Sequence, residues 1–220
     1  MPGINGKAVT TYKKSNVGKN WPAAVLPKSD EFNQYKLGLQ WAWNHNPNDS
    51  LWSLTERKGF LRLKTGKVVD NLKFARNTLT QRHFGPASTG TAEFDVSRLK
   101  DGDVAGLAIF QDPYAYIAVQ QKNGKKRLFM IDNGKEVAAI ETLSTSKIYL
   151  QAKVDAITDD ATFFYSTDDI SFKQLGNSFA MKFNLSVFTG NKFCLFNYAT
   201  QNSGGYADIN WFRMQVAATK

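Results

Sequence analysis

Apolar and polar residues alternate with a period of two along much of this sequence, and the alternation restricts the chain to extended structure. Leu39, Trp41 and Trp43 share one parity, and residues 92–96 and 148–154 alternate in the same way. Successive side chains of a β-strand point to opposite faces of a sheet, so this period predicts strands with one buried face. Because no window of a dozen residues keeps helical spacing, we expect an all-β protein.

Short turn sequences separate these runs. Asn123-Gly124 and Asn133-Gly134 favour tight β-hairpins, because both central residues of such turns adopt positive φ. Residues 104–110 are continuously apolar, which indicates a strand buried on both faces. Many short strands between regularly spaced turns predict a two-sheet antiparallel β-sandwich of the jelly-roll type.

The chain divides near residue 29. Residues 1–28 hold three glycines and three prolines and few periodic apolar positions, a composition that is typical of a linker or arm. Residues 29–220 show no second boundary. We therefore expect them to form a single β-sandwich module.

The composition argues against several classes of function. The 28 Lys and Arg exceed the 19 Asp and Glu, which gives a net charge of +9, but the basic residues are spread along the chain. Their densest cluster, residues 122–127, has the sequence of a hairpin tip, so we expect no nucleic-acid partner. No stretch approaches the roughly 18 apolar residues of a membrane helix, and no signal-peptide pattern opens the chain. We therefore expect no membrane partner and no secretory leader in this sequence.

The sequence offers little catalytic chemistry. Cys194 lies inside an apolar run, which is typical of a buried, inert thiol, and only His45 and His83 are available as imidazole bases. No glycine-rich phosphate loop is present. Acidic residues occur in strand-like segments, but no spacing marks two of them as a glycosidase pair. We expect this chain to have no catalytic activity of its own.

Residues 39–47 are the first candidate recognition segment. Trp41 shares a face with Leu39 and is predicted to be a core residue. Trp43 lies beside Asn44 and His45, and Trp52 follows a polar loop, so each indole is either a core or loop anchor or a platform for a sugar ring. Aromatic faces stack on sugar C–H surfaces, and amide and imidazole groups bond sugar hydroxyls. Trp43, Asn44, His45 and Trp52 are therefore candidate carbohydrate-binding residues.

Two further polar segments are candidate recognition sites. Residues 74–86 contain a strand that is polar on both faces, including Arg76 and Gln81. Because unpaired buried polar groups cost about 1–3 kcal/mol each, we expect this strand to line a wet face, to form an edge covered by another domain, or to be an ordinary exposed strand. Gln111 and Tyr114 lie where Pro113 breaks a strand, so Tyr114 is expected either to stack on a sugar or to cap the sandwich.

Two carboxylates suggest a structural metal. Asp30 opens the first predicted strand of the sandwich, and Asp208 lies in the last. If the terminal strands are neighbours, these side chains and adjacent carbonyls would supply hard oxygen ligands for Ca²⁺. The alternative is a turn cap together with a solvated aspartate.

Several of these segments resemble one known family. Residues 30–33, 37–47, 52–57, 59–63, 75–82 and 196–200 are similar, in order, to motifs of the C-terminal concanavalin-A-like domain of family-43 glycoside hydrolases, the β-xylosidase and α-L-arabinofuranosidase group. The resemblance covers about residues 29–214. It implies a concanavalin-A-like sandwich that accompanies a catalytic domain.

The resemblance also implies partners. In the family, the bond-cleaving carboxylates lie in an N-terminal β-propeller, which no part of this chain resembles. In some members a Phe of the accessory domain closes the catalytic pocket, and Phe84 is the candidate here. The parent enzyme is expected in the bacterial periplasm or outside the cell.

Two functions remain open at this point. The first is a noncatalytic carbohydrate-binding module for a plant cell-wall polysaccharide of the xylan or arabinoxylan type. The second is a structural domain that docks on the catalytic β-propeller and completes its active site without binding sugar itself.

Overall fold

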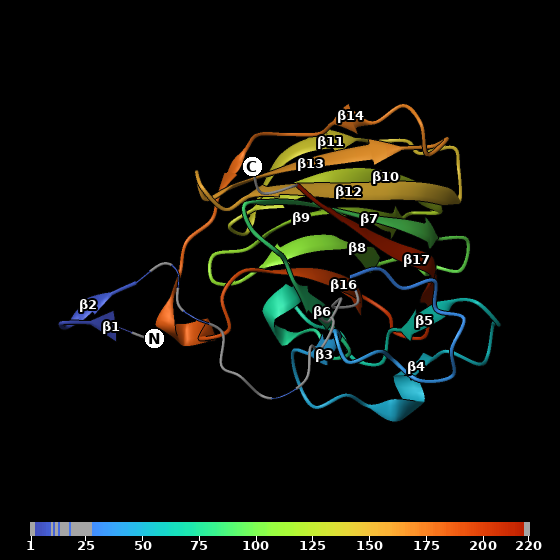
Figure 1. The fold of residues 1–220 in the computed structure, drawn as a ribbon. Helices are drawn as coiled ribbons and strands as arrows, with labels where there is room; N and C mark the ends of the chain where they lie inside the picture. The colour runs from blue at the N-terminus through green and yellow to red at the C-terminus, as the bar shows by residue number, and fades with distance from the viewer. Residues whose placement is uncertain (1–2, 10, 12, 14–17, 19–27, 218–220) are drawn as a thin grey trace.

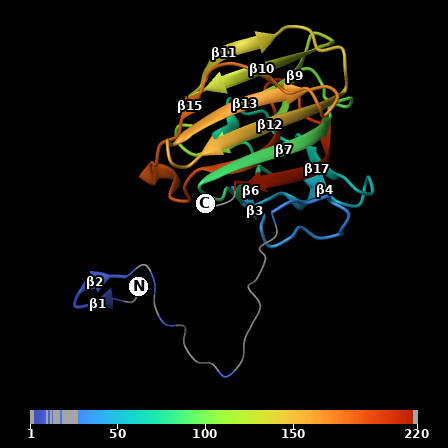
Figure 2. The same ribbon diagram turned by 45° about the horizontal axis from the view of Figure 1, so that its top comes forward.

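The computed structural model describes residues 3–9, 11, 13, 18 and 28–217. Near the N-terminus, β1 (Gly3–Ile4) and β2 (Lys7–Ala8) pair as an antiparallel hairpin, which Figure 2 shows apart from the main body. Asn5 and Gly6 form its turn with positive φ values of 52° and 75°. The predicted arm therefore contains a small hairpin, while most of residues 10–27 lie outside the described part.

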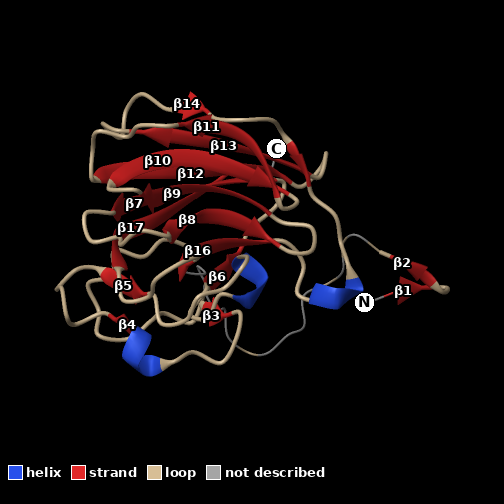
Figure 3. Ribbon diagram, turned by 180° about the vertical axis from the view of Figure 1, so that it is seen from behind, coloured by secondary structure: helices blue, strands red, loops and turns tan. Residues whose placement is uncertain are grey.

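The main body is a two-sheet antiparallel sandwich, as predicted (Figures 1 and 3). The first sheet has the strand order β11-β10-β9-β8-β16-β6-β3. Its strands are β3 (Ala42–Trp43), β6 (Leu79–Arg82), β8 (Asp103–Phe110), β9 (Ala115–Lys122), β10 (Lys125–Asp132), β11 (Lys135–Ile140) and β16 (Lys192–Ala199).

The second sheet has the order β14-β13-β12-β7-β17-β5-β4, and β15 also pairs with β13. Its strands are β4 (Trp52–Ser53), β5 (Leu61–Lys64), β7 (Ala87–Asp95), β12 (Lys147–Asp155), β13 (Asp160–Ser166), β14 (Lys173–Gln174), β15 (Phe179–Ala180) and β17 (Tyr206–Val216). The helical elements of the described residues are three short 3₁₀ turns: η1 (Asp49–Leu51), η2 (Leu72–Phe74) and η3 (Leu185–Val187). None of them is long and apolar enough to cross a membrane.

The predicted hairpins are confirmed. Asn123 and Gly124 join β9 to β10 with φ values of 51° and 74°, and Asn133 and Gly134 join β10 to β11 with 48° and 79°. Asparagine and glycine are the residues that tolerate this left-handed backbone at least cost.

Strand β8 is buried along its whole length, as the apolar run predicted. Its residues Leu107 and Ile109 belong to the main core between the sheets, and Ala108 and Phe110 belong to a second cluster on the other face of the same sheet. At Gly106, a Cβ would lie 2.2 Å from the carbonyl oxygen of Ile117, so only glycine fits this close strand pairing.

The second cluster, which we call the outer core, fills the outer face of the first sheet with aromatic side chains. Tyr116 and Tyr198 share a hydrogen bond of 3.0 Å there. Two segments contribute to it: residues 68–75, through Leu72 and Ala75, and the η3 region, through Val187. Loops that the sequence left without a role are thus fixed by packing against the sheet.

Candidate functional site

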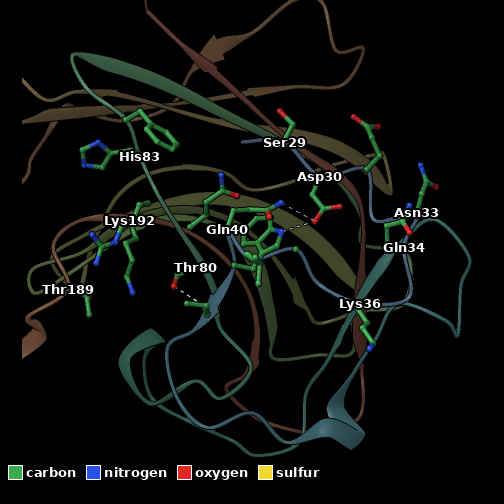
Figure 4. A pocket seen from close by; sticks show the side chains of 18 residues that line it. Ser29, Asp30, Asn33, Gln34, Lys36, Gln40, Thr80, His83, Thr189 and Lys192 are labelled. Atoms are coloured by element: carbon green, nitrogen blue, oxygen red, sulfur yellow. Dashed lines mark hydrogen bonds between the residues drawn. The ribbon is translucent and has the colours of Figure 1, made fainter. Parts of the chain in front are cut away.

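A cleft of about 990 Å³ opens at one end of the sandwich (Figure 4). Its walls come from residues 29–42, from Thr80 to Phe84 on and after β6, and from Thr189 and Lys192 around the start of β16. Segments distant in sequence therefore converge on one concave surface. Such convergence is typical of binding sites.

Asp30 and Trp41 anchor one side of the cleft to the core. The backbone of Asp30 exchanges two hydrogen bonds of 2.8 Å with Phe212 on β17. Its carboxylate accepts 2.8 Å bonds from the indole of Trp41 and the backbone amide of Phe32. The Trp41 ring lies between Phe32 and Phe212, with centroid distances of 5.9 and 5.3 Å. The prediction that Trp41 is a core residue is confirmed.

The expected calcium pair is not formed. Asp208 is buried, and its carboxylate accepts bonds of 2.7 and 2.9 Å from Arg62 and one of 3.0 Å from Arg57. Asp30 pairs with Phe212, four positions farther along β17, which is roughly 13 Å away in a strand. Two carboxylates separated in this way, one of them neutralised by guanidinium groups, do not fit the clustered oxygen ligands of Ca²⁺. The described residues contain no cluster of three or more His, Cys, Asp or Glu arranged for a metal.

The polar strand β6 lies inside the first sheet and also borders the cleft. It pairs with β16 on one side and with the two-residue β3 on the other, and Thr80, Gln81 and Arg82 line the cleft. Several polar groups on and just before it bond within the chain: the Thr80 hydroxyl donates to a carbonyl of β3, Gln81 Nε2 donates to the carbonyl of Lys28, and Asn77 exchanges two bonds with the backbone of Asn48. These backbone partners lie far away in the sequence, so the sequence did not show that part of the strand is bonded from within the module.

Three buried polar atoms at the cleft nevertheless have no partner in the described part of the chain. They are Oε1 of Gln40, Oε1 of Gln81 and Nδ1 of His83, and all three residues line the cleft. Burial lowers the pKa of His83, although the charge of Asp159 acts in the opposite direction. Because an unmet buried polar atom costs about 1–3 kcal/mol, the cleft offers donors and acceptors to an incoming group.

Two cations lie side by side at one end of the cleft, which we call the basic end. Lys192 on β16 and Arg82 on β6 are direct register partners. Lys192 is only 7% exposed. Burial lowers the pKa of its amine, and the charge of Arg82 acts in the same direction. Neither residue forms an ion pair with a carboxylate of the described segments.

Phe84 is a wall of the cleft and does not project from the surface. It is half-buried and packs against the main core. Its backbone amide donates a hydrogen bond to the Ser88 hydroxyl, and the amine of Lys28 lies 5.7 Å from its ring. A ring that closes the pocket of another domain would have to project from the surface, and the ring of Phe84 does not.

The side chains that do project lie on two loops that sequence reasoning missed. We call them the rim loops: residues 31–40 and residues 182–190. Leu39 is fully exposed and Tyr35 is 75% exposed on the first. On the second, Phe183 and Phe188 are 61% and 75% exposed and their rings meet at 5.9 Å. In the sequence both loops have the spacing of ordinary strands, so their exposure was not visible there.

The tryptophan group forms a separate region. Trp43 on β3 and Trp52 on β4 are half-buried against the main core, with ring centroids 5.1 Å apart. Trp52 also donates its indole hydrogen to Asp49 at 3.0 Å. The backbone amide of Asn44 bonds Thr78. These residues therefore have structural contacts, and both rings remain partly exposed.

A smaller groove of about 390 Å³ lies beside this group. Its wall includes Phe74, which is 66% exposed, together with His45 and Arg76. His45 Nε2 lies 2.7 Å from the carbonyl of Lys73, and Arg76 donates to the carbonyl of Asn46 at 3.0 Å. The groove thus unites two predicted recognition residues with an exposed ring that the sequence did not single out.

Gln111 and Tyr114 have structural positions. Gln111 is fully buried, and its amide donates to the carbonyl of Val187 at 2.9 Å, which fixes η3. Tyr114 is 6% exposed and stacks between Phe110 and Tyr116 in the outer core. Of the two alternatives for Tyr114, the structure favours the capping position.

Cys194 is fully buried in the outer core, where burial raises the pKa of its thiol well above the ordinary value. A thiol without access to solvent or a thiolate form is a poor nucleophile. The interpretation of Cys194 as an inert core residue agrees with this position.

Comparison with known proteins identifies the sandwich. Residues 29–215 match the family model described as the β-xylosidase C-terminal concanavalin-A-like domain. The chain is 34% identical to a β-xylosidase of Formosa agariphila, over 94% of this chain and 38% of that protein. It is 30% identical to the non-reducing end α-L-arabinofuranosidase BoGH43B of Bacteroides ovatus, over 66% of this chain and 26% of that protein.

Solved structures agree with this match. A bifunctional GH43-CE protein of Bacteroides eggerthii superposes with a TM-score of 0.83 at 41% identity, over 87% of this chain and 26% of that one. A GH43 glycoside hydrolase with an engineered active site superposes with a TM-score of 0.82 at 33% identity, over 90% of this chain and 42% of that one. This chain spans only about a quarter to two fifths of these proteins, and it belongs to the β-xylosidase C-terminal concanavalin-A-like domain family, the accessory module of family-43 glycoside hydrolases.

Proposed function

We propose that this chain is a noncatalytic module that docks through its cleft and rim loops onto the catalytic β-propeller of a family-43 glycoside hydrolase. The observation that carries the proposal is the group of exposed apolar side chains on the two loops bordering the cleft: Tyr35, Leu39, Phe183, Leu185 and Phe188. Single exposed apolar residues are common, but several on two loops that each contribute to the wall of one cleft, through Leu39 and Thr189, are typical of a protein interface.

The path of the chain supports the same face. Lys28, the residue that precedes the sandwich, is held near the cleft because its carbonyl accepts a 2.7 Å bond from Gln81. A domain that precedes residue 28 would therefore be tethered close to the cleft. A tether of this kind raises the effective concentration of the partner surface without any new contact.

The carboxylates beside the cleft support a noncatalytic role. Asp30 bonds Trp41 and the backbone, and Glu31 forms a two-bond ion pair with Arg213 at 2.7 and 2.9 Å. Neither is poised as a free acid beside a second carboxylate, the arrangement that glycoside hydrolysis requires. The purified chain is expected to release neither xylose nor arabinose from nitrophenyl glycosides.

Docking is tested with the catalytic part of the Formosa agariphila relative, prepared without the segment that this chain matches. Wild-type chain is expected to form a complex in calorimetry and to raise the melting temperature of the catalytic part. A Leu39→Ser, Phe188→Ser double variant should lose the complex. Ile170→Ser is the matched control, because Ile170 is 83% exposed and belongs to neither rim loop. Equal binding by all three proteins would contradict docking through this face.

A second function, binding of a xylan or arabinoxylan chain, is supported by the groove beside His45. There the exposed ring of Phe74 stands next to Arg76 and His45, a combination of stacking surface and planar polar groups that suits a sugar. Affinity electrophoresis in gels containing xylan, arabinoxylan or cellulose tests it. Retardation that Phe74→Ala abolishes would support binding there, and unchanged mobility on every polymer would exclude it.

A further inference from the structure

The basic end of the cleft contains an unfavourable charge arrangement. Lys192 and Arg82 face each other directly across two antiparallel strands, and like charges in that position repel. Lys192 is also 7% exposed, so solvent screens its charge poorly. Charged groups are seldom buried without a partner.

The described chain supplies no anion for this pair. Asp30 and Glu31, the acidic residues that line the cleft, are bonded to Trp41 and Arg213 respectively. Figure 4 shows Lys192 and His83 toward one side of the cleft and Asp30 toward the other. The repulsion is therefore not relieved within the module.

Unmet polar atoms lie in the same cleft. Gln40 Oε1 and Gln81 Oε1 are buried acceptors without donors, and His83 Nδ1 has no partner among the described residues. An amide-bearing polypeptide segment supplies the missing donors, and an acidic side chain on it supplies the missing anion. The cleft is thus chemically complementary to an acidic surface loop of a protein, and water alone would leave its cations without a counter-ion.

We propose that the basic end of the cleft, Arg82 with Lys192, is a carboxylate-binding site that takes an acidic side chain from the docked catalytic domain. This inference rests on the proposed docking function and names its specificity determinant. A guanidinium and an ammonium side by side form charge-assisted bonds to a single carboxylate, and such pairs fix register and orientation across an interface.

The geometry favours a protein carboxylate over a sugar acid. A polysaccharide bound in the cleft would need an open aromatic face, but Trp41 is 9% exposed and Phe84 is half-buried against the core. Among the apolar side chains that line the cleft itself, the fully exposed one is the aliphatic side chain of Leu39. Complementary charges placed across a protein interface set its specificity and register.

The first experiment uses the chain alone. Lys192→Met keeps the length of the side chain but removes the charge, so the thermal midpoint of the isolated chain is expected to rise. Lys125→Met, at an exposed hairpin tip, is the control for loss of one positive charge and should leave the midpoint unchanged. A fall in the midpoint of Lys192→Met would mean that the ammonium already has a stabilising partner, and it would overturn the proposal whether or not docking occurs.

The second experiment measures the dissociation constant with the catalytic part described above at about 50 and 500 mM salt, since salt screens exposed charges. The wild type is expected to bind more weakly at high salt. Lys192→Met and Arg82→Gln should each weaken binding at low salt by about tenfold and reduce the salt dependence. Lys125→Met should behave as wild type.

The two proposals fail in different ways. If the wild type does not bind the catalytic part, docking is wrong, and the carboxylate site falls with it. If the wild type binds, Leu39→Ser weakens binding and Lys192→Met does not, docking stands and the carboxylate site is wrong. Retardation by glucuronoxylan but not by arabinoxylan, abolished by Lys192→Met, would assign the anion to a sugar acid and also overturn the proposal.

Discussion

Two groups of charged residues in this molecule differ in whether their charges have counter-ions within the described chain. At one, Arg57 and Arg62 bind Asp208, Arg57 also binds Asp95, and Glu56 bonds Arg62 and Lys64. At the basic end of the cleft, Arg82 and Lys192 face each other with no carboxylate among the described residues. The first group, which we call the arginine network, is complete within the sandwich. The second is complete only if something outside the sandwich joins it.

The difference teaches how a module divides its charges between folding and assembly. The arginine network links β5, β17 and the end of β7, so its ion pairs hold strands in register. The guanidinium of Arg57 also stacks on Phe60 at 3.7 Å, and that of Arg62 on Tyr206 at 4.0 Å. The basic end forms no comparable ion pairs among the described residues, and its like-charge pair is expected to lower the stability of the fold. A cost of this kind is expected at functional sites.

The largest effect is expected from breaking the arginine network. Asp208→Ala leaves Arg62, whose side chain is 15% exposed, without its main counter-ion, and we expect a loss of about 3 kcal/mol in the free energy of unfolding. Urea unfolding measures this loss. Glu141→Ala is the control: its carboxylate is 75% exposed and Arg127 keeps Glu136, so the expected change is below about 0.5 kcal/mol. Similar losses for both variants would remove the contrast between the two charge groups.

A smaller loss is expected where the outer core meets the rim. Gln111→Leu removes the amide that bonds the carbonyl of Val187 and leaves that carbonyl and the amide of Asp112 without their partner, at a cost of about 2 kcal/mol. Hydrogen exchange should show faster exchange at residues 184–187 than in the wild type. If exchange there is unchanged, η3 is held by packing alone.

A gain of about 0.5 kcal/mol is expected from Lys192→Met in the isolated chain, because the variant removes like-charge repulsion across β16 and β6. Burial lowers the pKa of Lys192, so between that lowered pKa and about 10.4 the folded state binds fewer protons than the unfolded state. The free energy of unfolding of the wild type should therefore rise with pH through this window.

The variant should lack that rise, so the difference between the two proteins should shrink as the pH approaches 10. The charged groups that affect the pKa of Lys192 are Arg82 and the buried thiol of Cys194, whose own pKa is raised by burial. A difference that is constant with pH would indicate that the amine is neutral or fully screened at all these values.

The smallest effect on stability is expected at the rim. Leu39 is fully exposed, so Leu39→Ser changes little buried area and should leave the free energy of unfolding within about 0.5 kcal/mol of the wild type. The same variant is expected to weaken docking. A clear loss of stability would show that Leu39 packs against the module in solution, and the rim loop would then be part of the fold.

Local sequence patterns predicted the elements well and the site poorly. The hairpin turns at Asn123-Gly124 and Asn133-Gly134 and the doubly buried β8 follow from φ preferences and from periodicity, which act over a few residues. The internal bonds of the polar strand β6 were not predicted, because the partners of Thr80 and Gln81 come from segments about 40 to 50 residues earlier in the chain. Long-range hydrogen bonds leave no local signal in a single sequence.

The candidate site shows the same limit. Trp43, Trp52, Gln111 and Tyr114 are aromatic or polar residues at strand ends, which is where ligand contacts and structural contacts look alike in sequence. The structure assigns Gln111 and Tyr114 to internal bonding and packing. The exposed Leu39, by contrast, had the alternation of an ordinary core position, because the pattern does not record which strands continue and which become loops.

By itself, the sequence determined that this chain is an all-β sandwich of a particular family, since alternation, turn residues and ordered motifs are local properties. Only the tertiary structure decided which charges are neutralised, which polar atoms lack partners and which apolar side chains face outward. Those outcomes depend on where segments such as residues 29–42, β6 and β16 meet in space. Burial and electrostatic pairing arise only where these segments are in contact, so no single segment determines them.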